Sequence, residues 1–394
     1  MRVAYVCADP GVPIFGRKGC SIHAQEVLRA LGRLGASVDL FAARIDDEPH
    51  DTPAFIRVHR LPKPDAPETA ARERAGFRAN AALRAALEAG GPFDLVYERY
   101  SLWSHAGMQY ARAAGTPGLL EVNAPLIDEQ ARHRALCHRN AAERVARRAF
   151  RAASAIVAVS EEVAAGVAAY VGPRDRIHVV PNGVDVRRFR PEVPPACPGD
   201  PDTFTVGFVG TLKPWHGLSL LVRAFETFAA RHTDARLLIV GDGPGARDLR
   251  NELAVRGLLG VSCITGAVDP EAVPSLLTSM TVAVAPYGGD TTFYFSPLKV
   301  FEYMAAGLPI VANRLGQLAC VIEDGVTGLL CRAGDPDDLA AALDRLYHET
   351  DLRARLGRAA RARAEQEHSW DSVCERLLEI ARLRVRRVAP EAAG

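Results

Sequence analysis

The sequence of 394 residues lacks several features that would assign a class of protein at once. Its eight cysteines form no Cys-x-x-Cys pair, so zinc-ribbon and thioredoxin-like sites have no support. No apolar stretch approaches the ~18 residues that a transmembrane helix needs. The 48 basic and 47 acidic residues leave a net charge of only +1, which argues against a nucleic-acid partner held by a global positive field.

The N-terminal residues do not predict a targeting signal either. The N-terminal apolar run ends at Asp9-Pro10-Gly11 and is too short for a signal peptide. Scattered cysteines without a disulfide framework suit a reducing compartment, and we therefore expect a cytoplasmic protein. The composition, 48% hydrophobic and 24% charged, is close to the globular average, and the length indicates two domains.

Short apolar runs alternate with amphipathic stretches along the whole chain. In the first half, runs such as Val3–Cys7 and Gly118–Val122 are separated by helical stretches such as Ser21–Leu34. The alternation restarts at Thr205–Val209 and ends in a helical stretch over Trp370–Arg387. Because alternating strands and helices build parallel βαβ units, we predict an α/β fold with two doubly wound, Rossmann-like sheets.

A proline-rich segment separates the two halves, with five prolines between Arg187 and Thr203. Proline donates no backbone hydrogen bond and fixes φ, so this segment is typical of a linker. The predicted parts are a first domain (1–186), the linker (187–203), a second domain (204–369) and a terminal helix (370–394).

The loop after the first strand combines glycines with a cation. Gly16, Lys18 and Gly19 precede the helix at Ser21, at the end of the sheet where ligands of α/β proteins bind. Glycine allows close approach of a backbone, and a helix N-terminus attracts anions. The loop is therefore either a phosphate or acceptor site or a plain turn-rich loop. His23 in the next helix is either a sugar contact or a structural histidine.

The second half repeats this pattern twice. Residues 210–217 (GTLKPWHG) join a strand to a helix through Gly210, Lys213 and His216. Residues 241–245 (GDGPG) begin at Gly241 and follow the next strand, where a simple tight turn is the alternative.

The loop over residues 286–297 is the most informative. It ends in Ser296 and Pro297, and proline suits the first turn of a helix because its missing N–H is not needed there. The N–H groups of Leu298 and Lys299 would then point at an anion. Glu302, one turn further on, can accept two hydrogen bonds from the vicinal diol of a ribose. The pattern predicts a nucleoside diphosphate site; the alternative is that Glu302 is a solvated residue or a capping partner.

Two other patterns have simpler explanations. Asp-x-Asp pairs, which bind a metal in other sugar transferases, occur at Asp200/Asp202 in the linker and at Asp335/Asp337 before a helix, where capping explains them. We expect no metal and no cofactor. The arginine-rich stretch Arg132–Arg151 predicts a basic helix that either contacts the inner face of a membrane peripherally or is a solvated face.

Four blocks of sequence, in order, resemble glycosyltransferase family 4, which has the GT-B fold. They are residues 159–163 (VSEEV), 180–185 (VPNGVD) followed by Phe189 and Pro191, 240–244 (VGDGP) and 301–312 (FEYMAAGLPIVA). The resemblance implies two domains facing across a cleft and retaining transfer of a sugar. The donor would be a nucleotide sugar, most often of UDP or GDP, bound mainly by the second domain. The acceptor would be a hydroxyl of a glycan, lipid-linked or small molecule.

The resemblance also implies residue roles. Glu302 would bind the ribose, the backbone of residues 297–299 the diphosphate, and Val268 the base, while the terminal helix would cross back to the first domain. The chain departs from the family pattern at four positions, Tyr294, Thr211, His216 and Asn123, where the family usually has glutamate, arginine, lysine and histidine.

The departures define the catalytic prediction. Lys213 and Lys299 would supply the missing charge, and Lys213, His216 and Glu302 are the predicted catalytic set. The leaving diphosphate would accept the acceptor's proton in a front-face reaction. The alternatives are a GT-B nucleotide-sugar epimerase, a nicotinamide dehydrogenase suggested by the glycines of residues 241–245, and a catalytically silent binding partner.

Overall fold

The chain folds into two α/β units. The computed structural model describes residues 1–16, 18–46, 52–172, 174–288, 294 and 296–388. The first unit comprises Met1–Asn182, Tyr294–Ser296 and Trp370–Gly394, and the second comprises Gly183–Phe293 and Pro297–Ser369. The proline-rich residues 187–203 contain no helix or strand and belong to the second unit.

The first unit is built on a parallel sheet whose described strands run in the order β3-β2-β1-β4-β5-β6-β7. This order winds outward from β1 in both directions, which confirms the doubly wound prediction. The strands are β1 (Arg2–Cys7), β2 (Ser37–Ala42), β3 (Ile56–Arg60), β4 (Leu95–Arg99), β5 (Gly118–Val122), β6 (Ala155–Ala158) and β7 (Ile177–Val179). The inner strands are buried on both faces, which explains their continuous apolar runs in the sequence.

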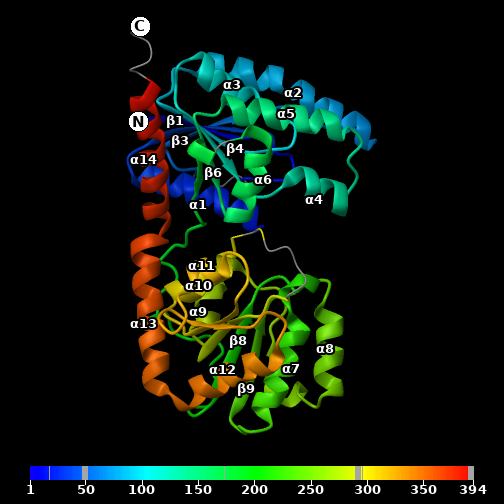
Figure 1. Ribbon diagram of the computed structural model, residues 1–394, viewed down its shortest axis with the longest axis vertical. Helices are drawn as coiled ribbons and strands as arrows, with labels where there is room; N and C mark the ends of the chain where they lie inside the picture. The colour runs from blue at the N-terminus through cyan, green and yellow to red at the C-terminus, as the bar shows by residue number, and fades with distance from the viewer. Residues whose placement is uncertain (17, 47–51, 173, 289–293, 295, 389–394) are drawn as a thin grey trace. The chain divides into compact units, whose positions relative to one another are not determined.

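Helices cover this sheet (Figure 1). They are α1 (Gly19–Arg33), α2 (Thr69–Gly90), α3 (Ala106–Ala113), α4 (Leu126–His133), α5 (Arg139–Ala152), α6 (Glu161–Val171) and α14 (Trp370–Val388). Helix α3 packs against α2 and α5, and α14 packs against α1. The terminal helix α14 is therefore part of the first unit although it ends the chain.

The basic stretch Arg132–Arg151 is not the single helix that was predicted. Helix α4 ends at His133 and α5 begins at Arg139. Between them the carboxylate of Glu73 accepts a hydrogen bond from the backbone N–H of His138 at 2.9 Å and thereby fixes the turn. The apolar side of α5 is buried against α3 and α6, so its arginine face alone is exposed.

The second unit repeats the architecture. Within the described chain its sheet has the order β10-β9-β8-β11-β12-β13 and only parallel pairs. The strands are β8 (Phe204–Val209), β9 (Ala235–Val240), β10 (Ser262–Ile264), β11 (Val282–Ala285), β12 (Ile310–Asn313) and β13 (Leu329–Cys331).

The helices of the second unit enclose one large apolar core. They are α7 (Leu218–Ala229), α8 (Ala246–Val255), α9 (Val273–Leu277), α10 (Leu298–Ala305), α11 (Leu318–Val321), α12 (Pro336–His348) and α13 (Thr350–Glu367). Helices α7 and α12 pack side by side on the core, and α10 packs on α13. Among the helices that are described, none combines the length and apolar character needed to cross a membrane.

Candidate functional site

Two loops meet where the strand order of the second sheet reverses, between β8 and β11. The loop over residues 210–217 follows β8 and ends at Gly217, whose φ of 63° is left-handed. A Cβ at Gly217 would lie 1.5 Å from the carbonyl oxygen of Pro286, just after β11. Glycine is therefore required for the two loops to touch. In open α/β sheets this reversal point is where ligands bind.

Glycines also bring the ends of β8 and β9 together. Gly210 (φ 144°) and Gly241 (φ 136°) adopt backbone conformations that other residues rarely use. A Cβ at Gly241 would lie 2.1 Å from the carbonyl oxygen of Gly210, and the N–H of Gly210 donates to Val240 at 2.9 Å. Two of the predicted donor residues thus form a close-packed backbone floor beside the reversal point.

Helix α10 starts at this floor. Pro297 is its N-cap, one position before the first turn in which the sequence placed it. The N–H groups of Leu298 and Lys299 are among those that have no partner inside a helix. Ser296 belongs to the first unit, where its hydroxyl oxygen accepts from the N–H of Asn182 at 3.1 Å. The serine is thus engaged in a structural contact.

Lys299 turns its side chain back toward the glycine floor. Its Nζ lies 4.1 Å from the centre of the Phe208 ring and 5.4 Å from that of Tyr287. A Cβ at Gly210 would lie 2.8 Å from Nζ, so glycine leaves the room that the ammonium occupies. Nζ is buried and has no hydrogen-bond partner among the described residues. Burial lowers the pKa of Lys299 to about 7, and nearby Glu302 opposes the shift.

His216 lies beside this lysine but is a poor source of charge. Burial, Lys299 and Lys213 lower its pKa to about 4, although a hydrogen bond to Thr211 opposes them. Its Nδ1 lies 2.5 Å from the carbonyl oxygen of Thr211, which cannot donate, so Nδ1 carries the proton. The neutral ring then has only a lone pair at Nε2. The predicted roles of His216, as a charge or as a donor to the leaving group, do not fit this geometry.

Lys213 remains available as a second cation. It is half-buried at the N-cap of the turn Pro214–His216, with Nζ 5.7 Å from the Trp215 ring. The loop therefore carries one lysine near its surface, and Lys299 provides a second, deeply buried one.

Glu302 lies one turn into α10 and is partly buried. Burial raises the pKa of Glu302, while Arg188 and Lys299 oppose the shift. Arg188 was missed by the sequence analysis, although it lies next to Phe189 of a quoted motif. Its guanidinium lies 4.7 Å from the Phe189 ring, and its Nε is buried without a partner in the described part of the chain. Arg188 is a further cation that could orient Glu302.

Val268 follows β10, whose end is held to the glycine floor by a bridge between Gly241 and Gly266. Val268 is half-buried, and no hydrogen bond of its backbone is made within the described residues. Its N–H and C=O are therefore free to bind a ligand. Residues 289–293 and 295 of the loop over residues 286–297 lie outside the described residues.

Tyr294 replaces the glutamate that the family usually has, and its surroundings explain what the tyrosine does. Its hydroxyl donates to the carboxylate of Glu129, and its carbonyl oxygen accepts from the hydroxyl of Ser160 at 2.6 Å. Tyr294 therefore joins the first unit through Glu129 and Ser160. This contact is a packing role, which the sequence could not indicate.

The glycine loop of the first unit is partly tied down. Gly16 is buried, and its carbonyl oxygen accepts from Nε2 of Gln25 at 2.9 Å. Lys18 is the N-cap of α1 and Gly19 its first residue, and both are exposed. Lys18 and the first N–H groups of α1 could therefore meet an anion, whereas Gly16 shapes the turn.

His23 has the structural role that was one of its two alternatives. Arg99 donates to its Nδ1 at 3.0 Å, and its Nε2 lies 3.0 Å from Glu121. Both ring nitrogens are thus occupied, and the ring is buried in an edge contact with Trp370 of α14. Although burial alone would raise it, His23, Arg99 and Asn123 lower the pKa of Glu121 to about 2. Asn123 thus belongs to this network.

The second Asp-x-Asp pair caps a helix, as expected. The carboxylate of Asp335 accepts from the N–H groups of Asp337 and Asp338, both at 3.0 Å, at the start of α12.

Comparisons of the sequence agree with the resemblance. The family model described as "Glycosyltransferase Family 4" matches residues 17–188, and that described as "Glycosyl transferases group 1" matches residues 203–349. A D-inositol 3-phosphate glycosyltransferase of Acidothermus cellulolyticus is 30% identical, with 95% of this chain and 86% of that protein covered. A protein of the same name from Corynebacterium jeikeium is 27% identical, with 96% and 95% covered.

Solved structures show the same architecture. A sucrose-phosphate synthase from Thermosynechococcus elongatus has a TM-score of 0.71 at 20% identity, with 97% of this chain and 98% of that chain covered. HepE of Anabaena, solved with UDP, has a TM-score of 0.67 at 18% identity, with 96% and 99% covered. At these identities the likeness shows the fold, which is the GT-B fold.

Proposed function

The chain belongs to glycosyltransferase family 4 and is an enzyme of that kind, and from this premise we propose that it moves a sugar from a UDP-sugar to an acceptor hydroxyl with retention of configuration. The support for UDP is that HepE of Anabaena, which has the same fold, was solved with UDP and with UDP-glucose. The family assignment sets the dehydrogenase alternative aside.

The observation that carries the proposal is the buried ammonium of Lys299 beneath Gly210. An unpaired buried cation is costly, so its presence at the carboxyl end of the sheet indicates an anionic partner. The free N–H groups at the start of α10 add partial positive charge at the same place. A diphosphate matches both features, and Glu302 one turn on suits the ribose hydroxyls.

In the proposed mechanism, two lysines stabilise the negative charge that develops in the transition state. When the bond from sugar to diphosphate breaks, negative charge grows on the leaving phosphate. Lys299 and Lys213 stabilise that charge, together with the N-terminus of α10. His216 remains neutral and lies beside Lys299. The leaving phosphate accepts the proton of the attacking hydroxyl on the same face of the sugar, and no metal is required.

For the acceptor we propose a small phosphorylated polyol as the first candidate to test. The support is the printed name of the relatives, D-inositol 3-phosphate glycosyltransferase, at up to 30% identity. Exposed Lys18 and the start of α1 in the first unit offer a site for such a phosphate.

Peripheral contact with a membrane is a secondary proposal. It rests on Arg144, Arg148 and Arg151, which are exposed at helical spacing on α5. Such a face would be attracted to anionic lipid and would add a lipid-linked acceptor to the candidates.

The test asks which nucleotide sugar binds and whether Glu302 binds the ribose hydroxyls. UDP-, GDP- and dTDP-sugars are screened by thermal shift, and the wild type is expected to respond to UDP-sugars because a ligand of the native state raises its stability. UDP and its 2′-deoxy analogue are then titrated into wild type and Glu302→Gln. The wild type should prefer UDP by roughly tenfold, as for a hydrogen bond to a charged group, and the variant should lose the preference.

The control variant is Glu323→Gln, an exposed glutamate on the same unit. Equal binding of the two nucleotides by the wild type would remove Glu302 from the site. Conversion of the UDP-sugar to its epimer without any acceptor would support the epimerase instead.

A further inference from the structure

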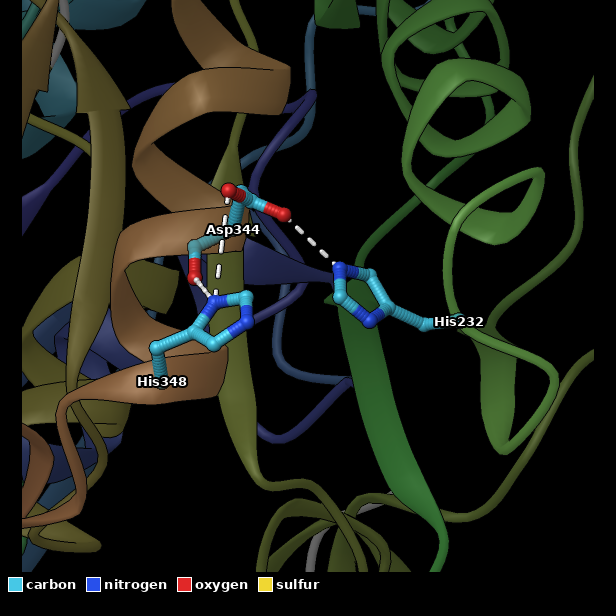
Figure 2. A group of neighbouring side chains, drawn as sticks. All are labelled: His232, Asp344 and His348. Carbon is cyan, nitrogen blue, oxygen red and sulfur yellow. Dashed lines mark hydrogen bonds and ion pairs between the residues drawn. The ribbon is translucent and has the colours of Figure 1, made fainter.

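A histidine–carboxylate cluster lies in the second unit outside the proposed site. His232 follows α7, while Asp344 and His348 occupy successive turns of α12. The ligand atoms of the three side chains all lie within 4.8 Å of one another. Figure 2 shows Asp344 and His348 projecting from α12, with the His232 ring reaching the Asp344 carboxylate from the turn after α7.

Close contacts join the three residues. Nε2 of His232 lies 2.7 Å from Oδ1 of Asp344, and Nδ1 of His348 lies 4.0 Å from Oδ2. The same Nδ1 also lies 2.9 Å from the backbone oxygen of Asp344. Atoms bound to one ion at about 2.1 Å are roughly 3 Å apart, so a small turn of the exposed His348 ring completes the set.

The surrounding residues hold the His232 ring in place before any ion arrives. The buried ring of His232 packs against Tyr347, with the ring centres 3.8 Å apart and the planes tilted by 32°, and lies 4.6 Å from the Phe228 ring. The Tyr347 hydroxyl is in turn hydrogen-bonded to the carboxylate of Asp234 at 3.0 Å. Such support around metal-binding histidines fixes ring orientation, and His348, 62% exposed, leaves a path for an ion.

We propose that His232, Asp344 and His348 bind one divalent transition-metal ion, with Zn²⁺ as the best match. Two imidazoles and one carboxylate suit Zn²⁺ and its first-row neighbours, whereas Ca²⁺ and Mg²⁺ prefer oxygen ligands. Three protein ligands leave a position for water. Arg231 lies near Asp344 and lowers the affinity somewhat.

The role of this ion is structural. His232 precedes β9, so the cluster lies at the amino end of the strands, whereas the proposed donor site lies at their carboxyl ends. The ion would tie the end of α7 to the end of α12 and would not touch the donor. The inference is therefore independent of the proposed function.

The full chain is treated with EDTA and dialysed. Zn²⁺ is then titrated in while calorimetry records the binding, and Co²⁺ is titrated in while absorption records it. The wild type should bind one Zn²⁺ per chain and unfold at a higher temperature when loaded. His348→Ala and Asp344→Asn should each bind at least tenfold more weakly and lose the thermal shift. His133→Ala, an exposed histidine on α4, is the matched control and should bind as the wild type does.

Two outcomes would overturn the proposal. One is no binding by the wild type at millimolar Zn²⁺. The other is binding that His348→Ala and Asp344→Asn leave unchanged, which would assign the ion to cysteines such as the exposed Cys137. Because His348 is on the surface, its variant keeps the fold, and equal melting temperatures of variant and wild type in EDTA check this.

Discussion

Replacement of Lys299 by methionine should make the protein more stable and weaken its binding of nucleotide. Methionine keeps the length of the side chain and removes the buried charge. A pKa lowered from 10.5 to about 7 means that holding this group in the folded state costs about 4 kcal/mol at pH 7. The contact of the ammonium with the Phe208 ring returns at most about 2 kcal/mol. We expect Lys299→Met to raise the free energy of unfolding by about 2 kcal/mol at pH 7.

The pH dependence gives this prediction its sign. Between pH 7 and 10.5 the lysine is protonated in the unfolded chain and neutral in the folded chain. The contribution of Lys299 to the wild-type free energy of unfolding therefore rises with pH. The advantage of Lys299→Met should therefore shrink from pH 7 toward pH 10. Urea unfolding at four pH values measures it, and Lys213→Met, at the half-buried lysine of the loop over residues 210–217, is the control variant.

Nucleotide binding supplies the second measurement. UDP should bind Lys299→Met roughly 10- to 100-fold more weakly, as for loss of a charged hydrogen bond. Calorimetry in buffers of different ionisation enthalpy should show that the wild type takes up about half a proton at pH 7 and the variant takes up none. A destabilised variant, or a stability difference that does not change with pH, would refute the reasoning.

Two further predictions concern the first unit. Tyr294→Glu, which restores the usual family residue, should lower stability by about 1–3 kcal/mol and fail to raise turnover, because it sets a second carboxylate against Glu129; thermal unfolding and a transfer assay check this, and higher turnover would contradict it. The triple change of Arg144, Arg148 and Arg151 to glutamine should abolish sedimentation with anionic vesicles at low salt, since each arginine contributes about 1 kcal/mol near such a surface. Sedimentation equal to that of the wild type would exclude this face.

Local chemistry made much of the fold predictable from the sequence. Gly118–Val122 is a strand at the residues predicted, and the predicted Thr205–Val209 lies within β8, because buried parallel strands must be continuously apolar. Gly210 and Gly241 were recognised because close backbone approach requires glycine. The capping by Asp335 followed from its place before a helix.

The sequence by itself therefore determined the two doubly wound sheets, the loops at their carboxyl ends and the candidate residues on them. Only the tertiary structure decided the charge and availability of those residues. His216 is neutral because burial and Lys299 surround it, and His23 is occupied because Arg99 and Glu121 reach it from neighbouring strands. Protonation and hydrogen bonding depend on burial and on partners distant in the sequence, and neither can be read from local spacing.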